Sequence, residues 1–159
     1  MSRSYRGGLG VIAQEAAWAD GADIPATPSW TTWARAIDVA FNGSKAEAAV
    51  PSRESLWNLR VGGLMDGAIT VSYRLRHLAD TIWDGLVTKW LADTPLLVAC
   101  MSTTIATSGA KGWQVPALIL EVGESQPLAD GASGSVNIVP TDARDASGDL
   151  LSPSRLVTP

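Results

Sequence analysis

The stretch "MDGAITVSYRLR", residues 65 to 76, is the clearest strand in the sequence. Two sets of side chains alternate along it after an Asp-Gly turn signal. The apolar set is Ile69, Val71, Tyr73 and Leu75, and the polar set is Thr70, Ser72, Arg74 and Arg76. Alternation with period 2 predicts a strand whose two faces differ. We expect the apolar face to pack on a core, and the hydroxylic, basic face to meet water or another subunit.

Further strands are predicted on both sides of this one. "WARAIDVAF" (33–41) alternates with Trp33, Ile37, Val39 and Phe41 on its large-residue face. The segments "PLLVACM" (95–101), "WQVPALILEV" (113–122) and "GSVNIVP" (134–140) also read as strands, and "LGVIA" (9–13) suits an edge strand. Pro116 lacks a backbone N–H, so it favours an edge position or a bulge for its strand.

One segment changes to a helical period. Within residues 80–92, Ile82, Leu86, Val87 and Trp90 lie close to one stripe of a helix. Asp80 suits the N-cap position, and Pro95 marks the end. Gly85 costs such a helix about 1 kcal/mol relative to alanine. We therefore predict one amphipathic helix at about 80–92.

The remaining segments organise the chain into one β domain with two arms. Residues 1–31 are rich in Gly, Ala, Pro and Ser and read as an N-terminal arm, and the polar, proline-flanked residues 143–159 read as a C-terminal arm. Residues 42–56 read as a long polar loop, and loops of that length are usually functional or mobile. The fold class is mainly β, a sandwich or barrel-like domain over 32–142 with one flanking helix.

Composition limits the possible functions. The chain has 159 residues and a net charge of −4, so it is a poor candidate for tight nucleic-acid binding, which needs many Lys and Arg contacts to phosphate. It contains no apolar run long enough to span a membrane, and its N-terminal residues carry no signal-peptide pattern. Cys100 is the only cysteine, and it lies in an apolar run typical of a buried thiol.

Reactive groups form no recognisable constellation. The single histidine, His77, has no evident nucleophile or orienting partner, and capping and the helix dipole account for Asp80 and Asp84. No catalytic, metal-binding or phosphate-binding motif is present. We therefore expect no enzyme activity, no cofactor and no metal. The seven tryptophans favour a core or a subunit interface, with ligand stacking as the alternative.

Charge is distributed unevenly. The block from Arg53 to Arg76 is mildly basic, whereas residues from Glu121 onward hold six acids against Arg144 and Arg155. Such asymmetry suits head-to-tail contacts between copies of one protein, although ordinary solvated faces explain it as well.

The order of elements resembles that of the tail tube (major tail) proteins of long-tailed bacteriophages. The matching pieces are Asp66 to Tyr73, Ile82 to Pro95, Gly112 to Val122, Pro127-Leu128 and Ser135 to Pro140, so the resemblance covers roughly residues 32–142. It is a pattern of strands, turns and one helix rather than a catalytic motif.

The resemblance implies a structural virion protein that is assembled in the bacterial host. It implies hexameric rings that stack into a tube, with DNA passing through the lumen without specific binding. It also implies contacts with other tail proteins (tape measure, terminator, baseplate or tip) and none with a membrane. Ring-stacking residues would lie in the 42–56 loop, namely Asn42, Lys45, Glu47, Arg53 and Glu54. The candidate positions facing the lumen or a neighbouring subunit are Thr70, Ser72, Arg74 and Arg76.

Two alternatives remain open. Tail terminators, connectors and capsid decoration proteins are also small, β-rich and ring-forming or trimeric. A glycan-binding β-sandwich would instead be a monomer with at least two tryptophans on one open face.

Overall fold

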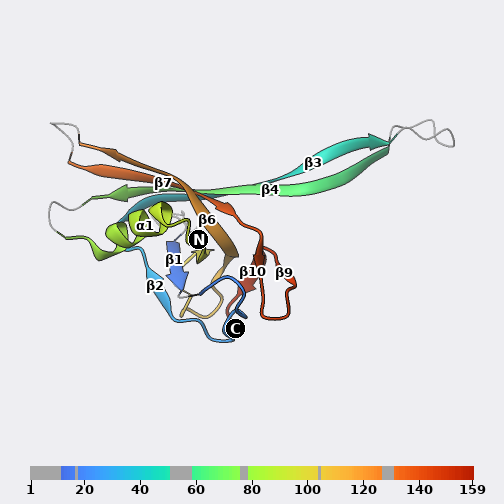
Figure 1. The fold of residues 1–159 in the computed structure, drawn as a ribbon, viewed down its shortest axis with the longest axis horizontal. Coiled ribbons are helices and arrows are strands. Elements are labelled where there is room, and N and C mark those ends of the chain that lie inside the picture. Colours follow the sequence, from blue (N-terminus) through green and yellow to red (C-terminus); the bar gives the residue numbers. More distant parts are fainter. Residues whose placement is uncertain (1–11, 17, 51–58, 76–78, 104, 127–130) are drawn as a thin grey trace, which may run out of the picture.

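The structure is a computed structural model that describes residues 12–16, 18–50, 59–75, 79–103, 105–126 and 131–159 (Figure 1). For residues 12, 14, 46–50 and 59–65 it describes the backbone alone. The fold is mainly β with one helix, as predicted. Eight strands form one antiparallel sheet in the order β2-β1-β5-β6-β7-β4-β3, and β10 pairs with one end of β6.

The sheet contains strands of very different lengths. Their bounds are β1 Ile12–Ala16, β2 Trp30–Thr32, β3 Ala36–Val50, β4 Leu59–Arg74, β5 Leu96–Met101, β6 Lys111–Ser125, β7 Ser133–Pro140 and β10 Ser154–Val157. A second, two-stranded sheet pairs β8 (Ala143–Arg144) with β9 (Leu150–Leu151). The pair β3–β4 is a long hairpin whose far end projects beyond the body of the molecule (Figure 1).

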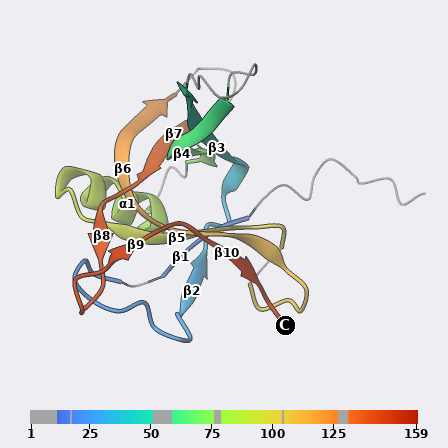
Figure 2. The same ribbon diagram turned by 90° about the vertical axis from the view of Figure 1, so that its right-hand side faces the viewer.

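The sheet curls around a single main core. Ala13 of β1 and Val39 of β3 come from nearly opposite ends of the strand order, yet both belong to the same buried cluster. The predicted inward face of β4 is confirmed, because Ile69, Val71 and Tyr73 are all buried. The sheet is therefore a half-barrel whose concave face holds the core (Figure 2).

The helix α1 (Thr81–Leu91) confirms the predicted range. Asp80 is its N-cap and accepts a hydrogen bond of 3.2 Å from the backbone N–H of Trp83. Trp83 and Leu86 are buried in the core, and Ile82 and Val87 pack against it. The helix thus closes one end of the half-barrel.

The interpretation of residues 42–56 as a loop is wrong for 42–50. These residues continue β3, and their pairing with β4 runs through a bulge between Lys45 and Glu47. A two-stranded ribbon that leaves the core needs no apolar face, so the sequence there shows no period-2 pattern. Residues 51–58 lie outside the described residues.

The strand predicted from residue 33 begins later, and Ile37 does not face the core. A register shift between Ala36 and Asp38 places Ile37 in a β-bulge, where its side chain is 65% exposed. Val39 and Phe41 keep the inward direction that the alternation predicted, Val39 buried and Phe41 packed against the core.

Two predictions of edge strands are also wrong. β1 lies between β2 and β5, so the edge of the sheet is β2. β6 is central although it contains Pro116. The carbonyl of Pro116 accepts from the N–H of Thr141, so its nitrogen faces the same side, between the start of β10 and the end of β7. The backbone N–H that Pro116 lacks would point into this gap between two strands, so the sheet loses no hydrogen bond.

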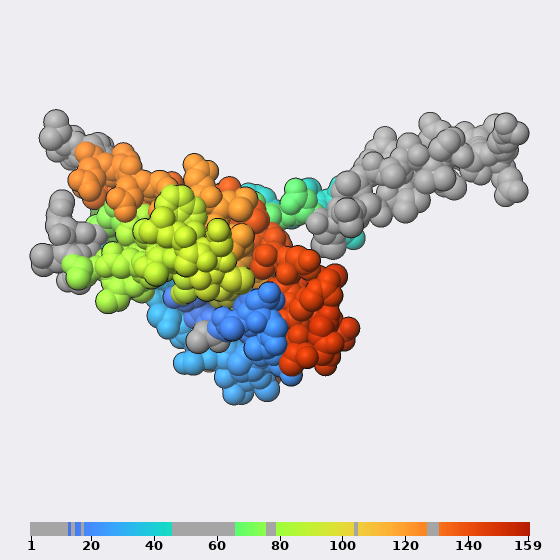
Figure 3. All heavy atoms as spheres, viewed as in Figure 1, coloured from blue at the N-terminus to red at the C-terminus, as the bar shows by residue number. Residues whose placement is uncertain are grey.

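Parts of both terminal segments pair with the rest of the chain. β1 and β2 complete one end of the sheet, and β10 returns to β6. Asp20 accepts from the backbone N–H of Arg144 at 2.9 Å, and Asp23 accepts from that of Ala146 at 3.1 Å. The N- and C-terminal segments therefore meet in one lobe (blue and red in Figure 3).

Candidate assembly surfaces

The polar face of the half-barrel carries most of the predicted lumen or subunit positions. Thr70, Ser72 and Arg74 alternate with the buried residues of β4 and are all exposed. Arg76 lies outside the described residues. β7 continues the hydroxylic surface, because exposed Ser135 pairs with Ser72 and exposed Ser133 pairs with Arg74.

Acidic residues on neighbouring strands offset the charge of Arg74. Asp38 of β3 lies opposite Ser72, and Glu121 of β6 lies in the row of Thr70, so both carboxylates share this face. Arg74 makes no ion pair with another described residue. The polar face is therefore hydroxylic with scattered charges of both signs.

The five predicted ring-stacking residues do not gather on one described loop. Asn42 and Lys45 are exposed on β3, within the hairpin, and Glu47 lies further along the same strand. Arg53 and Glu54 lie outside the described residues. The structure thus places part of this set on a projecting β-ribbon.

The sheet ends in two strands that have one neighbour each. β2 pairs with β1, and β3 pairs with β4, and neither has a second partner among the described strands. β3 contributes a long run of open backbone groups, a surface to which another strand can pair. The exposed side chain of Ile37 lies on this edge strand.

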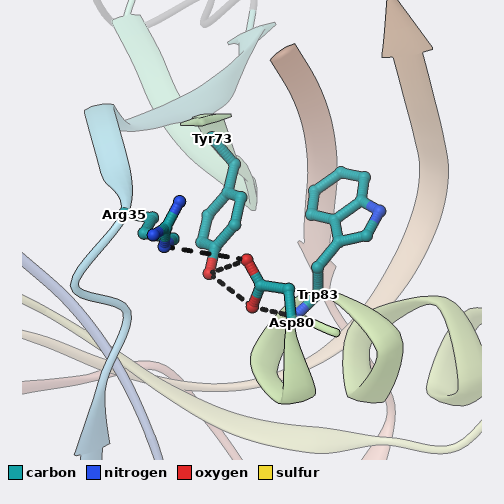
Figure 4. Close-up of polar contacts among 4 residues, drawn as sticks. All are labelled: Arg35, Tyr73, Asp80 and Trp83. Atoms are coloured by element: carbon teal, nitrogen blue, oxygen red, sulfur yellow. Dashed lines mark hydrogen bonds and ion pairs between the residues drawn. The ribbon is translucent and has the colours of Figure 1, made fainter. Parts of the chain in front are cut away.

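A buried polar cluster joins the sheet to the helix, as Figure 4 shows. The Tyr73 hydroxyl donates to the Asp80 carboxylate, 3.1 Å from Oδ1 and 3.3 Å from Oδ2, and Arg35 Nε lies 3.9 Å from Oδ2. Burial, followed by the hydrogen bond and negative charge of Asp80, raises the pKa of Tyr73 to about 12. Sequence reasoning found the capping role of Asp80 but not these partners, which are set by tertiary packing.

Trp83 anchors the helix on the concave face. Its ring stacks on Tyr73 with centroids 5.3 Å apart, and its Nε1 donates to Glu124 Oε1 at 2.7 Å. Gly134 lies directly beneath the ring, and a Cβ there would overlap the indole. Near the other end of the helix, Lys89 pairs with Glu15 of β1 at 2.9 Å. These contacts fix α1 to several separate strands.

Within the described part of the chain, no three metal-ligating side chains cluster. Burial raises the pKa of the Cys100 thiol to about 12, which makes it a poor nucleophile. His77 is outside the described residues. Among the described tryptophans, Trp90 is the one in the exposed class, at 36%. No described helix has the length and apolar character needed to cross a membrane.

Known structures share this fold. A chain of the native gene transfer agent virion has a TM-score of 0.66 at 12% identity, covering 95% of this chain and 98% of that one. A chain from the tail of an empty gene transfer agent particle with C6 symmetry has 0.63 at 14%, covering 88% and 96%. The SPP1 tail tube has 0.67 at 10%, covering 94% and 78%.

The fold is therefore that of tail tube proteins, and the resemblance seen in the sequence is confirmed at the level of fold. No protein-family model matches the sequence. No curated protein matches it either.

Proposed function

We propose that this chain is the subunit of a phage-type tail tube. Copies form hexameric rings, the rings stack, and the tube conducts DNA during ejection into a host. The observation that carries this proposal is the pair of open sheet edges, β2 and β3, at opposite ends of one curled sheet. An edge strand as long as β3 is a liability in a monomer and is satisfied when neighbouring sheets join.

The polar face of the half-barrel supports a role in lining the lumen. On the described part of this face Ser, Thr and Asn side chains predominate, and Arg74 of β4 is accompanied by Asp38 and Glu121. A surface with few Lys and Arg side chains neutralises few phosphates and releases few counterions from DNA. It therefore binds DNA weakly. Such a wall lets DNA slide.

The β3–β4 hairpin supports a role in ring stacking. It projects from the body (Figure 1), and Asn42 and Lys45 are exposed along it. Under this proposal the hairpin, including 42–56, and the arms 1–31 and 143–159 bridge neighbouring rings. Further partners are the tape measure, terminator and baseplate or tip proteins. The mature location is the virion tail, after assembly in the host cytoplasm.

The C6 symmetry of the gene transfer agent tail supports six subunits per ring. Under this proposal the chain has a structural role and no enzyme activity.

Negative-stain electron microscopy of the purified protein, at low and high concentration, tests the proposal. Hollow tubes that lengthen with concentration are expected. Single rings of fixed size would instead identify a terminator or connector, since only a tube protein polymerises without limit. A monomer at every concentration would overturn both.

A further inference from the structure

The half-barrel has two ends, and the described residues close only one of them. Helix α1 covers the end marked by Tyr73 of β4 and Gly134 of β7. Farther along the same two strands, Gly67 in the middle of β4 and Pro140 at the end of β7 border an open cleft of about 510 Å³. In the described part of the chain the helix therefore caps the core at one end, and the cleft lies at the other.

Aromatic and proline side chains form the walls of this cleft. Phe41 and Trp113 lie with ring centroids 5.5 Å apart, and Pro140 and Pro153 line the same space. A smaller hollow of about 290 Å³ shares Phe41 and Trp113 and extends to Cys100. We term the two hollows together the aromatic cleft. Its apolar groups are open to water, and covering them would stabilise a contact by about 25 cal/mol for each Å² of apolar surface buried.

The rim of the aromatic cleft is cationic. Lys45 lines the larger hollow, and Lys111 and Arg155 line the smaller one. Among the described residues that line either hollow, Asp66 is the one carboxylate. The three cations are exposed and make no ion pair with a described residue. The cleft therefore suits an occupant that is apolar at its tip and negatively charged around it.

This chain carries such a surface elsewhere. Residues 142–151, which form the β8–β9 hairpin, together with residues 20–23, form a lobe that we term the acidic knob. Its aspartates are Asp20, Asp23, Asp142, Asp145 and Asp149, with Arg144 as the one basic residue. At its end, Leu150 is 59% exposed. An exposed leucine in a lobe with five aspartates and one arginine complements an aromatic cleft lined by Lys and Arg.

The acidic knob is held in shape before any partner binds. Asp145 Oδ1 accepts from the backbone N–H groups of Ser147 and Asp149, both at 2.9 Å. Asp20 and Asp23 brace the same turn through their bonds to Arg144 and Ala146. A preorganised surface loses little entropy on docking.

We propose that the acidic knob of one copy docks into the aromatic cleft of a neighbouring copy. This inference rests on the proposed tube function and names the surfaces of one subunit contact. The two surfaces are formed by different sets of residues. A contact between unlike surfaces of two copies is heterologous, and a heterologous contact can close a ring.

Charge reversal tests the contact. Arg155→Glu and, separately, Asp149→Lys are each expected to raise the critical concentration for assembly roughly tenfold, equal to about 1.4 kcal/mol. The double variant should restore most of the loss, because the pair is then reversed and complementary. Thermal melting of each variant checks that the subunit is folded. Unchanged assembly in both folded single variants would overturn the proposal.

A disulfide test reports the contact whether or not tubes form. Leu150→Cys and Ser44→Cys are made in separate chains and mixed under mild oxidation; Ser44 lines the cleft. A covalent heterodimer is expected only in the mixture, and not when Thr94→Cys, an exposed position after α1, replaces Leu150→Cys. No heterodimer in a sample that forms tubes would refute the docking but leave the tube. A heterodimer in a sample without tubes would support the docking and refute the tube.

Discussion

The Tyr73 hydroxyl contacts both carboxylate oxygens of Asp80, at 3.1 and 3.3 Å, and so joins the end of β4 to the first turn of α1. Both groups are shielded from water, and the acceptor is charged. We expect Tyr73→Phe to lower the free energy of unfolding by about 1–2 kcal/mol. Urea denaturation followed by circular dichroism measures the change.

A matched variant separates the Tyr73 bond from the helix cap. Asp80→Asn keeps a good N-cap residue and a hydrogen-bond acceptor but removes the charge near Arg35. We expect it to cost less than Asp80→Ala, which loses the cap to Trp83 as well. Equal losses in the two variants would show that the charge, and not the cap, is the main contribution.

Tyr73 also gives the protein a specific alkaline transition. Its pKa is raised to about 12 in the folded state, against about 10 for an unfolded chain. The protonated tyrosine therefore stabilises the fold fully below pH 10, and this contribution is lost as the pH rises from 10 to 12. Unfolding free energies measured across that window should fall more steeply for the native protein than for Tyr73→Phe. Parallel curves would contradict the assignment.

Gly134 is required by the position of Trp83. A Cβ at residue 134 would overlap the indole ring, which also stacks on Tyr73 and donates a hydrogen bond to Glu124. We expect Gly134→Ala to cost about 1–3 kcal/mol, because the helix must shift to relieve the overlap. A quenched or shifted tryptophan emission should accompany the loss. Native stability in this variant would mean that Trp83 can move freely.

Gly85 provides the opposite case within the helix. It lies in the middle of α1, and a Cβ added at this position would meet no atom of another described residue within 4 Å. Gly85→Ala should therefore stabilise the protein by up to about 1 kcal/mol, seen as a higher midpoint in urea. A loss of stability would indicate that another part of the protein packs directly against the backbone of Gly85.

The sequence predicted the elements whose pattern is local. The alternation of residues 69–75 identified the buried side of β4, and Asp80 with the apolar stripe identified α1. It did not predict the extension of β3 to Val50, because a ribbon outside the core buries no apolar face. It placed Ile37 inward because a bulge leaves no local sequence mark.

The candidate surfaces were predicted less completely than the elements. Thr70, Ser72 and Arg74 share a face as expected, because period 2 fixes their direction. The aromatic cleft brings together Phe41, Trp113 and Arg155 from three strands. These residues are far apart in the sequence, so no local spacing predicts that they line one hollow. The sequence located its basic block at residues 53–76, whereas Lys111 and Arg155, which line the cleft, lie on β6 and β10.

Ile37 tests the edge of the sheet directly. It is a large apolar side chain, 65% exposed, at the bulge of the unpaired strand β3. If sheets of neighbouring subunits join at this edge, Ile37→Asp brings a charge into a contact that excludes water, and a buried unpaired charge is costly. We expect the variant to remain a folded monomer with an unchanged urea midpoint, while tubes disappear from electron micrographs. Ile37→Val, which keeps the apolar surface, should assemble normally. Tubes formed by Ile37→Asp at native concentrations would show that this edge faces solvent in the assembly, and the joint between sheets would then have to lie elsewhere on β3.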